Sequence, residues 1–280
     1  MGKCNLCGEY AGYFRYRHRA CVEKRELANN TLVSTGVALL YGEGAGGESD
    51  VVKGWKSWRQ VADEGFLNDA ERKGFAVKVL EEAIERSLED KLLEEPEQER
   101  LMAWMEEAEL DRNDPAVDPL NHRLFRAQML RQLFNGEEPK TMGLDGNLPV
   151  LLTKKEKLLY IFQGVNFYED RTTTHYEGRS SGVSIRVAKG VYYRTGGFKG
   201  HPVQETSTTL IDTGMVVLTD MQLYFHGPKK SFRTPYNKII GLEPYSDGVG
   251  VRKDGTTAKP QIFQGLDGWF TYNIIKHFAP

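Results

Sequence analysis

The chain has 280 residues and a mass of 31.7 kDa, which predicts about two domains at ~150 residues per domain. Its composition, 40 % apolar and 27 % charged, excludes a largely disordered chain, a collagen-like repeat and a disulfide scaffold. No apolar run approaches the ~18 residues of a membrane span, and MGKCNLCGEY at the start lacks the apolar core of a signal peptide. We therefore expect a cytoplasmic protein without a transmembrane segment.

Charge is distributed unevenly along the chain, although the net charge is only −2. Residues 1–28 carry a net +3, residues 48–118 a net −11 and residues 151–280 a net +6. Such asymmetry predicts separate modules with different partners, or modules that contact one another. The small net charge argues against a dedicated binder of duplex DNA.

A metal-binding motif opens the chain, and we interpret residues 1–28 as a zinc knuckle. Cys4-x2-Cys7-x10-His18-x2-Cys21 uses all three cysteines of the protein together with one histidine. The ligands come in two pairs separated by a short loop: Cys4 with Cys7, which we call the first hook, and His18 with Cys21, the second hook. Together they supply the tetrahedral set of thiolate and imidazole ligands that zinc prefers. Four protein ligands leave no open position, so a structural zinc ion is expected, with ordinary buried cysteines as the alternative.

The segment between the two hooks interleaves aromatic and basic residues, which suggests a binding surface. Contact with single-stranded nucleic acid would use aromatic faces for stacking and arginines for phosphate contacts. The candidate residues are Tyr13, Phe14, Arg15, Tyr16, Arg17 and Arg19. A protein partner is the preferred reading, and in a third reading the aromatics only cover the metal.

Next we expect a linker over residues 29–54, because its apolar piece ends in the glycine cluster GEGAGG. Residues 55–135 predict an acidic helical block, since Leu80, Ala83, Ile84 and Leu88 recur at helical spacing. The segment 88–101, LEDKLLEEPEQERL, is similar to acidic helical modules of the TerB type.

From residue 151 the hydrophobic period changes from helical spacing to alternation. Short strands such as SGVSIRV, GVYYR, GMVVLT and MQLYFHG are expected over 151–280, followed by a C-terminal amphipathic helix, DGWFTYNIIKHFAP. Antiparallel strands capped by one helix predict a small barrel or bent sandwich. The predicted fold class is therefore α+β and multidomain: a zinc knuckle, a helical block and an antiparallel β domain.

The β segment resembles a bacterial pleckstrin-homology-like or GRAM-like domain over about residues 155–280. The resemblance rests on Leu218-Thr219, on Leu223-Tyr224-Phe225 and on Tyr236-Asn-Lys-Ile-Ile240, although Gln222 stands where a basic residue is usual. It implies contact with a protein, or with phosphoinositides or other phospholipids, and it supplies no catalytic residues.

Basic residues beside the predicted hairpins could meet an anionic ligand such as a lipid headgroup. The candidates are Arg186, Arg194, Lys199, Lys229, Lys230 and Arg233, with an ordinary solvated rim as the alternative.

We expect no enzyme activity. The G-x-G-x-x-G match at 42–47 lacks its βαβ context, and the G-x-S-x-G match at 178–182 precedes a strand where a helix is required. The predicted function is that of a zinc-containing adaptor that recognises a protein through the β domain and the knuckle. Binding of single-stranded nucleic acid or of anionic lipid is the alternative.

Overall fold

The computed structural model describes residues 2–41, 47–89, 92–142, 148–188, 191–255 and 258–279, with the backbone alone described for 171–188 and 191–206. The chain forms two compact units, Met1–Pro139 and Lys140–Pro280. The fold class is α+β, as expected: six helices, a seven-stranded antiparallel sheet and a small two-stranded sheet. Among the helices in these ranges, none is long and apolar enough to cross a membrane.

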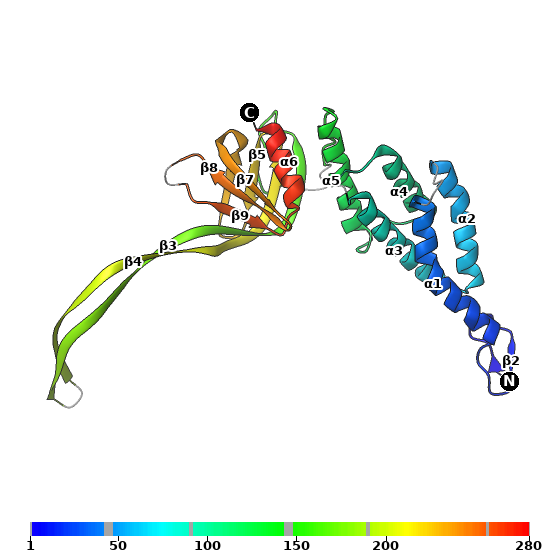
Figure 1. Cartoon of the computed structure of the whole chain (residues 1–280), viewed down its shortest axis with the longest axis horizontal. Helices are drawn as coiled ribbons and strands as arrows, with labels where there is room; N and C mark the ends of the chain where they lie inside the picture. Colours follow the sequence, from blue (N-terminus) through cyan, green and yellow to red (C-terminus); the bar gives the residue numbers. More distant parts are fainter. Residues whose placement is uncertain are drawn as a thin grey trace. The chain divides into compact units, whose positions relative to one another are not determined.

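The first unit, which we call the helical unit, begins with two short strands and continues with five helices (Figure 1). Strands β1 (Gly2–Lys3) and β2 (Tyr10–Gly12) pair antiparallel. The helices are α1 (Arg19–Tyr41), α2 (Glu48–Glu64), α3 (Asp69–Ser87), α4 (Glu95–Glu107) and α5 (Asp118–Phe134).

The segment expected to be a linker, 29–54, is mostly helical where the structure describes it, and Gly47 is the extended residue before α2. Residues 29–41 continue α1, and 48–54 begin α2. Within this segment, Gly36 is buried where α1 meets α3 and α4. A Cβ atom at Gly36 would lie 2.6 and 2.9 Å from the γ carbons of Val79, so the glycine allows the two helices to approach closely. The glycine cluster at 42–46 lies outside the described residues.

Three tryptophans form the centre of the helical unit. The rings of Trp55 and Trp58 stack at 4.9 Å, and Trp104 meets both edge-on at 5.0 and 5.2 Å. The indole of Trp58 donates to the carbonyl of Leu32 at 2.7 Å, so the buried N–H is satisfied. Trp104 likewise donates to the carbonyl of Ala76 at 3.0 Å. These contacts tie α1, α2, α3 and α4 into one core.

The second unit, which we call the β unit, is one antiparallel sheet with a C-terminal helix. Its strands are β3 (Leu158–Ala188), β4 (Val191–Thr219), β5 (Gln222–His226), β6 (Ser231–Pro235), β7 (Ile239–Tyr245), β8 (Gly248–Lys253) and β9 (Gln261–Gln264). A 3₁₀ turn, η1 (Tyr236–Lys238), joins β6 to β7, and α6 (Gly268–Phe278) ends the unit. The segments expected as separate short strands between 158 and 219 belong to the long hairpin of β3 and β4.

The sheet is not a closed barrel. The strand order is β6-β5-β4-β3-β9-β8-β7, so β6 and β7 are its two edges. Closure would require β6 and β7 to pair, and the described residues show no such pairing. The expected barrel is therefore unsupported, and the sheet stays open between these edges.

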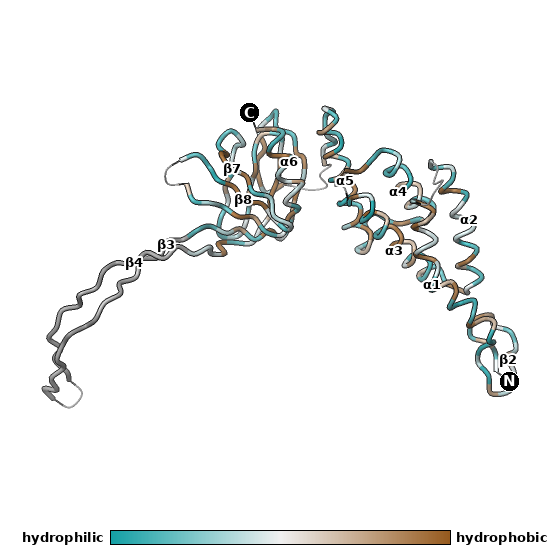
Figure 2. Tube along the Cα trace, viewed as in Figure 1, coloured by the Kyte–Doolittle hydropathy of each residue, from teal (hydrophilic) through white to brown (hydrophobic). Residues whose placement is uncertain are grey.

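Aromatic side chains fill the interior of the β unit. Phe167, Phe225, Phe232 and Phe263 lie with ring centroids 5.0 to 6.3 Å apart. The hydrophobic helix α6 (Figure 2) contacts β7 and β8. Its Phe270 is fully buried. Burial of these rings stabilises the unit in the absence of any cross-link, because each aromatic side chain removes a large apolar area from water.

A buried carboxylate joins the segment before β3 to the sheet. Glu156, only 9 % exposed, accepts hydrogen bonds from the hydroxyls of Thr219 at 2.7 Å and Tyr224 at 3.0 Å. The side-chain amide of Gln222 and the backbone N–H of Thr153 donate to it as well, at 3.1 and 3.0 Å. Burial alone would raise the pKa of Glu156, but these hydrogen bonds hold it below its ordinary value.

Candidate metal centre and recognition loop

The four residues of the predicted zinc knuckle lie together. The ligand atoms of Cys4, Cys7, His18 and Cys21 all lie within 4.8 Å of one another. The Nδ1 atom of His18 is 3.3 Å from the Sγ atom of Cys7 and 3.6 Å from that of Cys21. A tetrahedral zinc ion with bonds of about 2.0 to 2.3 Å separates its ligand atoms by about 3.3 to 3.8 Å. The site could therefore bind a metal ion such as zinc.

The first hook is shaped by a tight turn. The backbone N–H of Gly8 donates to the carbonyl of Cys4 at 2.9 Å, and the N–H of Cys4 donates to Glu9 at 2.7 Å. Gly8 has φ of 78°, a left-handed conformation that favours glycine. This turn brings Cys7 back toward Cys4, which is 1 % exposed.

The second hook joins the end of the loop to the first turn of α1. Cys21 is the third residue of α1, and the backbone N–H of Val22 donates to the carbonyl of His18 at 3.1 Å. The Nε2 atom of His18 lies 3.0 Å from the carbonyl oxygen of Tyr10. A histidine that donates from Nε2 to this carbonyl leaves Nδ1 free to bind metal, so Tyr10 fixes the orientation of the imidazole.

The pKa values of the two buried thiols, Cys4 and Cys21, are shifted in opposite directions when no metal is bound. Hydrogen bonding from the Cys7 backbone lowers the pKa of Cys4 to about 6, whereas burial and the neighbouring thiols raise that of Cys21 to about 11. The Tyr10 carbonyl raises the pKa of His18. A divalent cation would supply the positive charge that this group of thiols requires for deprotonation.

The aromatic loop, which we define as residues 10–17, projects its rings into solvent. Phe14 is 95 % exposed, Tyr16 71 %, Tyr13 70 % and Tyr10 54 %. Sequence reasoning left open whether one or two of these rings cover the metal; in the structure all four rings are more than half exposed. Phe14 has φ of 65°, a conformation that bulky side chains rarely adopt.

The base of the aromatic loop is held by the backbone. The N–H of Asn5 donates to the carbonyl of Tyr16 at 2.9 Å, and Arg17 Nε donates to the Asn5 side chain at 3.2 Å. A Cβ atom at Gly2 would collide with the carbonyl oxygen of Arg15, so the loop closes directly against β1. Arg15 and Arg17 are exposed, and exposed Arg19 forms a 2.8 Å ion pair with Glu23.

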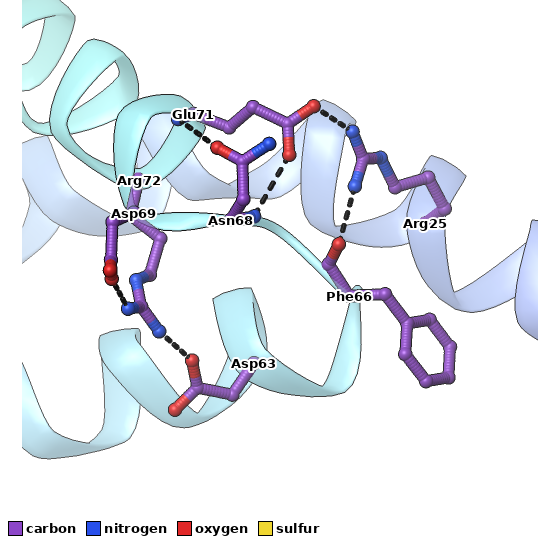
Figure 3. A network of polar contacts seen from close by, with 7 residues as sticks. All are labelled: Arg25, Asp63, Phe66, Asn68, Asp69, Glu71 and Arg72. Atoms are coloured by element: carbon purple, nitrogen blue, oxygen red, sulfur yellow. Dashed lines mark hydrogen bonds and ion pairs between the residues drawn. The ribbon is translucent and has the colours of Figure 1, made fainter. Parts of the chain in front are cut away.

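Helix α1 connects the metal centre to the helical core. The segment with β2 lies beyond the N-terminal end of α1, and Cys21 in the first turn of α1 joins the two (Figure 1). Arg25, one turn after Cys21, donates to the carbonyl of Phe66 at 2.7 Å and forms an ion pair with Glu71 (Figure 3). Glu71 belongs to the capping box of α3 with Asn68. The loop is therefore carried on a helix whose orientation is fixed.

The six basic residues predicted for an anionic ligand do not form one described group. Arg186, Arg194 and Lys199 are in β3 and β4, and their side chains lie outside the described part of the chain. Lys229 and Lys230 form the turn between β5 and β6, where both backbone N–H groups donate to Asp212 at 2.7 and 2.8 Å.

The ammonium group of Lys230 turns inward. It pairs with Glu169 at 2.7 Å and lies 5.1 Å from the ring centroid of Phe167. These contacts give Lys230 a packing role, which the sequence did not predict.

Arg233 belongs to a basic cavity that sequence reasoning missed. The cavity, about 490 Å³, lies between β6, η1, the end of β8 and the start of β9. Its charged lining residues are four basic ones, Arg233, Lys238, Lys253 and Lys259, and two acidic ones, Glu169 and Asp254. Buried Thr234 and Gln261 also line it, and within the described residues Oγ1 of Thr234 and Oε1 of Gln261 have no hydrogen-bond partner. No local spacing could reveal this group, because the open edge of the sheet assembles it.

Comparison with protein-family models, with curated proteins and with solved structures finds no match for this chain. The resemblance of residues 155–280 to a pleckstrin-homology-like domain therefore stays a prediction.

Proposed function

We propose that the protein is a non-enzymatic, zinc-containing binding protein with the role of an adaptor. Cys4, Cys7, His18 and Cys21 would hold the ion, and three thiolates with one imidazole complete a tetrahedron. Such a closed site has no position for a substrate, which supports a structural role. The ion would supply folding free energy to a segment with few other buried contacts.

The observation that carries this proposal is the exposure of the aromatic loop above a fixed base. Phe14 is 95 % exposed in a left-handed backbone conformation, and neither feature helps the chain to fold. Exposed aromatic and arginine side chains are typical of the residues that dominate binding surfaces. In this proposal zinc holds the loop, and the loop binds.

For the β unit we propose a pleckstrin-homology-like fold that contacts a protein partner. Two antiparallel meanders, β3 to β6 and β7 to β9, joined through the β3–β9 pair and followed by α6, support this assignment. The partner would add an extended segment to the edge strand β6, since an unpaired edge accepts a further strand.

Zinc content and partner capture in three proteins test the proposal. Wild type should hold one equivalent of zinc, Cys4→Ser should lose it, and Phe14→Ala should keep it because its side chain is far from covering the metal. Immobilised wild type and Phe14→Ala are then compared for what they retain from lysate by quantitative mass spectrometry. Retention that depends on Phe14 supports a recognition loop; identical retention, or zinc-free wild type, contradicts it.

The basic cavity favours a second candidate function, binding of an anionic lipid. Four cationic side chains against the two carboxylates of Glu169 and Asp254 leave the lining net positive, which suits a phosphorylated headgroup. Sedimentation with phosphatidylserine vesicles should weaken in Lys238→Glu and Lys259→Glu, but not in the control Lys276→Glu on α6. Equal binding by all three variants, or to phosphatidylcholine alone, would rule out the cavity as the site.

A further inference from the structure

We infer that the aromatic loop is a binding platform for single-stranded nucleic acid. The inference rests on the proposed function, because it names the ligand of the same zinc-held loop. Three features carry it: the available ring faces, the charge of the loop and the shape of its support.

The rings of the loop leave faces available for stacking. Tyr10 and Tyr13 meet edge-to-face, with centroids 6.4 Å apart and planes at 87°, so neither ring covers both faces of the other. Phe14 and Tyr16 are 95 % and 71 % exposed. A base has two apolar faces of similar size, and stacking on an aromatic side chain requires no particular base identity.

The charge of the loop is complementary to a phosphate backbone. Residues 10–17 contain two arginines and no acidic residue, and a third arginine, Arg19, begins α1. Arg15 and Arg17 alternate with Phe14 and Tyr16 along the chain, which places phosphate-binding groups between stacking groups. The apolar surface of the loop is aromatic, so it presents flat faces on which bases can stack.

The support of the loop favours a single strand over a duplex. Reading the major groove of a duplex requires a helix or a two-stranded ribbon that enters it. Here Tyr10 begins β2, a strand of three residues, and the other three exposed rings follow β2 on a short loop. Unstacked bases of a flexible strand can reach such rings, whereas bases inside a duplex cannot.

Fluorescence anisotropy of labelled oligouridine and oligothymidine tests the inference on the intact, zinc-loaded protein. Phe14→Ala should weaken binding about 5- to 100-fold, the effect of losing one stacked base. Arg15→Gln should reduce the slope of log K against log salt by about 0.7, the value for one phosphate contact on a single strand.

Matched control variants test whether binding depends on the aromatic loop or on other exposed residues of the helical unit. Leu27→Ala removes an exposed apolar side chain from α1, and Arg112→Gln removes an exposed arginine after α4, so neither should change binding. All variants are compared at equal zinc content. A blunt duplex of the same length should bind more weakly than either single strand.

Several outcomes would overturn the inference. They are the absence of binding to both oligonucleotides, equal binding by Phe14→Ala, and duplex binding as tight as single-strand binding. If Phe14-dependent capture of a protein persists without oligonucleotide binding, the loop recognises a protein: this inference fails while the proposed function stands.

Discussion

Phe14 combines two unfavourable properties at one residue. Its side chain is almost fully exposed, and its backbone has φ of 65°. A left-handed conformation costs a non-glycine residue about 1–2 kcal/mol. Because the side chain makes almost no buried contact that could offset this strain, the residue is better explained by binding than by stability.

Phe14→Asn should therefore stabilise the folded, zinc-bound metal centre. The same variant should weaken binding of nucleic acid to the aromatic loop, because it removes a stacking ring. Asparagine tolerates left-handed φ, so relief of strain of about 1 kcal/mol should tighten the apparent zinc affinity about fivefold. Competition with a chromophoric chelator measures this affinity. A weaker affinity in the variant would show that the Phe14 ring contributes packing.

Glu156 provides a residue-scale test of the β unit. Its pKa lies below the ordinary value of 4.5 in the folded protein, so ionised Glu156 contributes stability above that value. This contribution is lost as the pH falls from about 4.5 toward the lower pKa of the folded state.

Glu156→Gln should destabilise the protein by about 1–3 kcal/mol at pH 7, because an amide cannot accept all the hydrogen bonds that the carboxylate receives. The difference from wild type should shrink as the pH falls below about 4.5, where wild type loses the same contribution. Urea unfolding of both proteins at several pH values measures this difference in the free energy of unfolding. Glu243→Gln, at an exposed ion pair with Arg252, is the control and should change stability by less than about 1 kcal/mol.

At the scale of elements, two glycines in helices have opposite roles. Gly36 in α1 faces the γ carbons of Val79 at less than 3 Å from an added Cβ atom, whereas Gly74 in α3 faces open space. Both positions would gain helix propensity from alanine, about 0.5–1 kcal/mol. Only at Gly36 does the methyl group collide with a packed neighbour.

We expect Gly36→Ala to lower the free energy of unfolding by about 1–2 kcal/mol, because overpacking outweighs the gain in propensity. Gly74→Ala should raise it by about 0.5–1 kcal/mol. Chemical denaturation of the two variants and of wild type shows whether the free energy of unfolding falls for Gly36→Ala and rises for Gly74→Ala. Stabilisation by Gly36→Ala would show that α1 and α3 are separated more widely than the structure indicates.

Sequence reasoning succeeded where one element carries its own signal. The four ligands of the metal centre are spaced in two short hooks, and the apolar stripe at Leu80, Ala83 and Ile84 marks a buried helix face. It failed for the second half of α1, residues 29–41, which was assigned to a linker because a glycine cluster follows it; this half contains Thr31, Ser34 and Thr35, residues of low helix propensity. In the structure their hydroxyls donate to carbonyls one turn earlier, which satisfies them within the helix.

The basic cavity was missed for a different reason. Arg233 is in β6, Lys238 in η1, Lys253 at the end of β8 and Lys259 just before β9, and each alone resembles an ordinary surface cation. Only the fold brings them to one cavity, because β6 is one edge of the sheet while β8 and β9 lie toward the other edge. Long-range pairing of this kind is not encoded in any local pattern.

At the scale of the whole molecule, core and charge both divide between the two units. The helical unit has its own tryptophan-centred core, and the β unit has its own cluster of phenylalanines. Residues 1–139 carry a net charge of −8 and residues 140–280 a net +6. Each unit is also of a size that can fold alone.

Expressed separately, residues 1–139 and 140–280 should each unfold in one cooperative transition, since each buries its own core. Tryptophan emission can follow each fragment, because three of the four tryptophans lie in the first fragment and only Trp269 in the second.

Removal of metal by a chelator should disorder the segment before α1 while leaving the transition of the tryptophan core nearly unchanged, because none of the three rings belongs to the metal centre. The second fragment, which contains no cysteine, should not respond to the chelator at all. Loss of the tryptophan-core transition on metal removal would mean that zinc stabilises the whole helical unit through α1, and not the recognition loop alone.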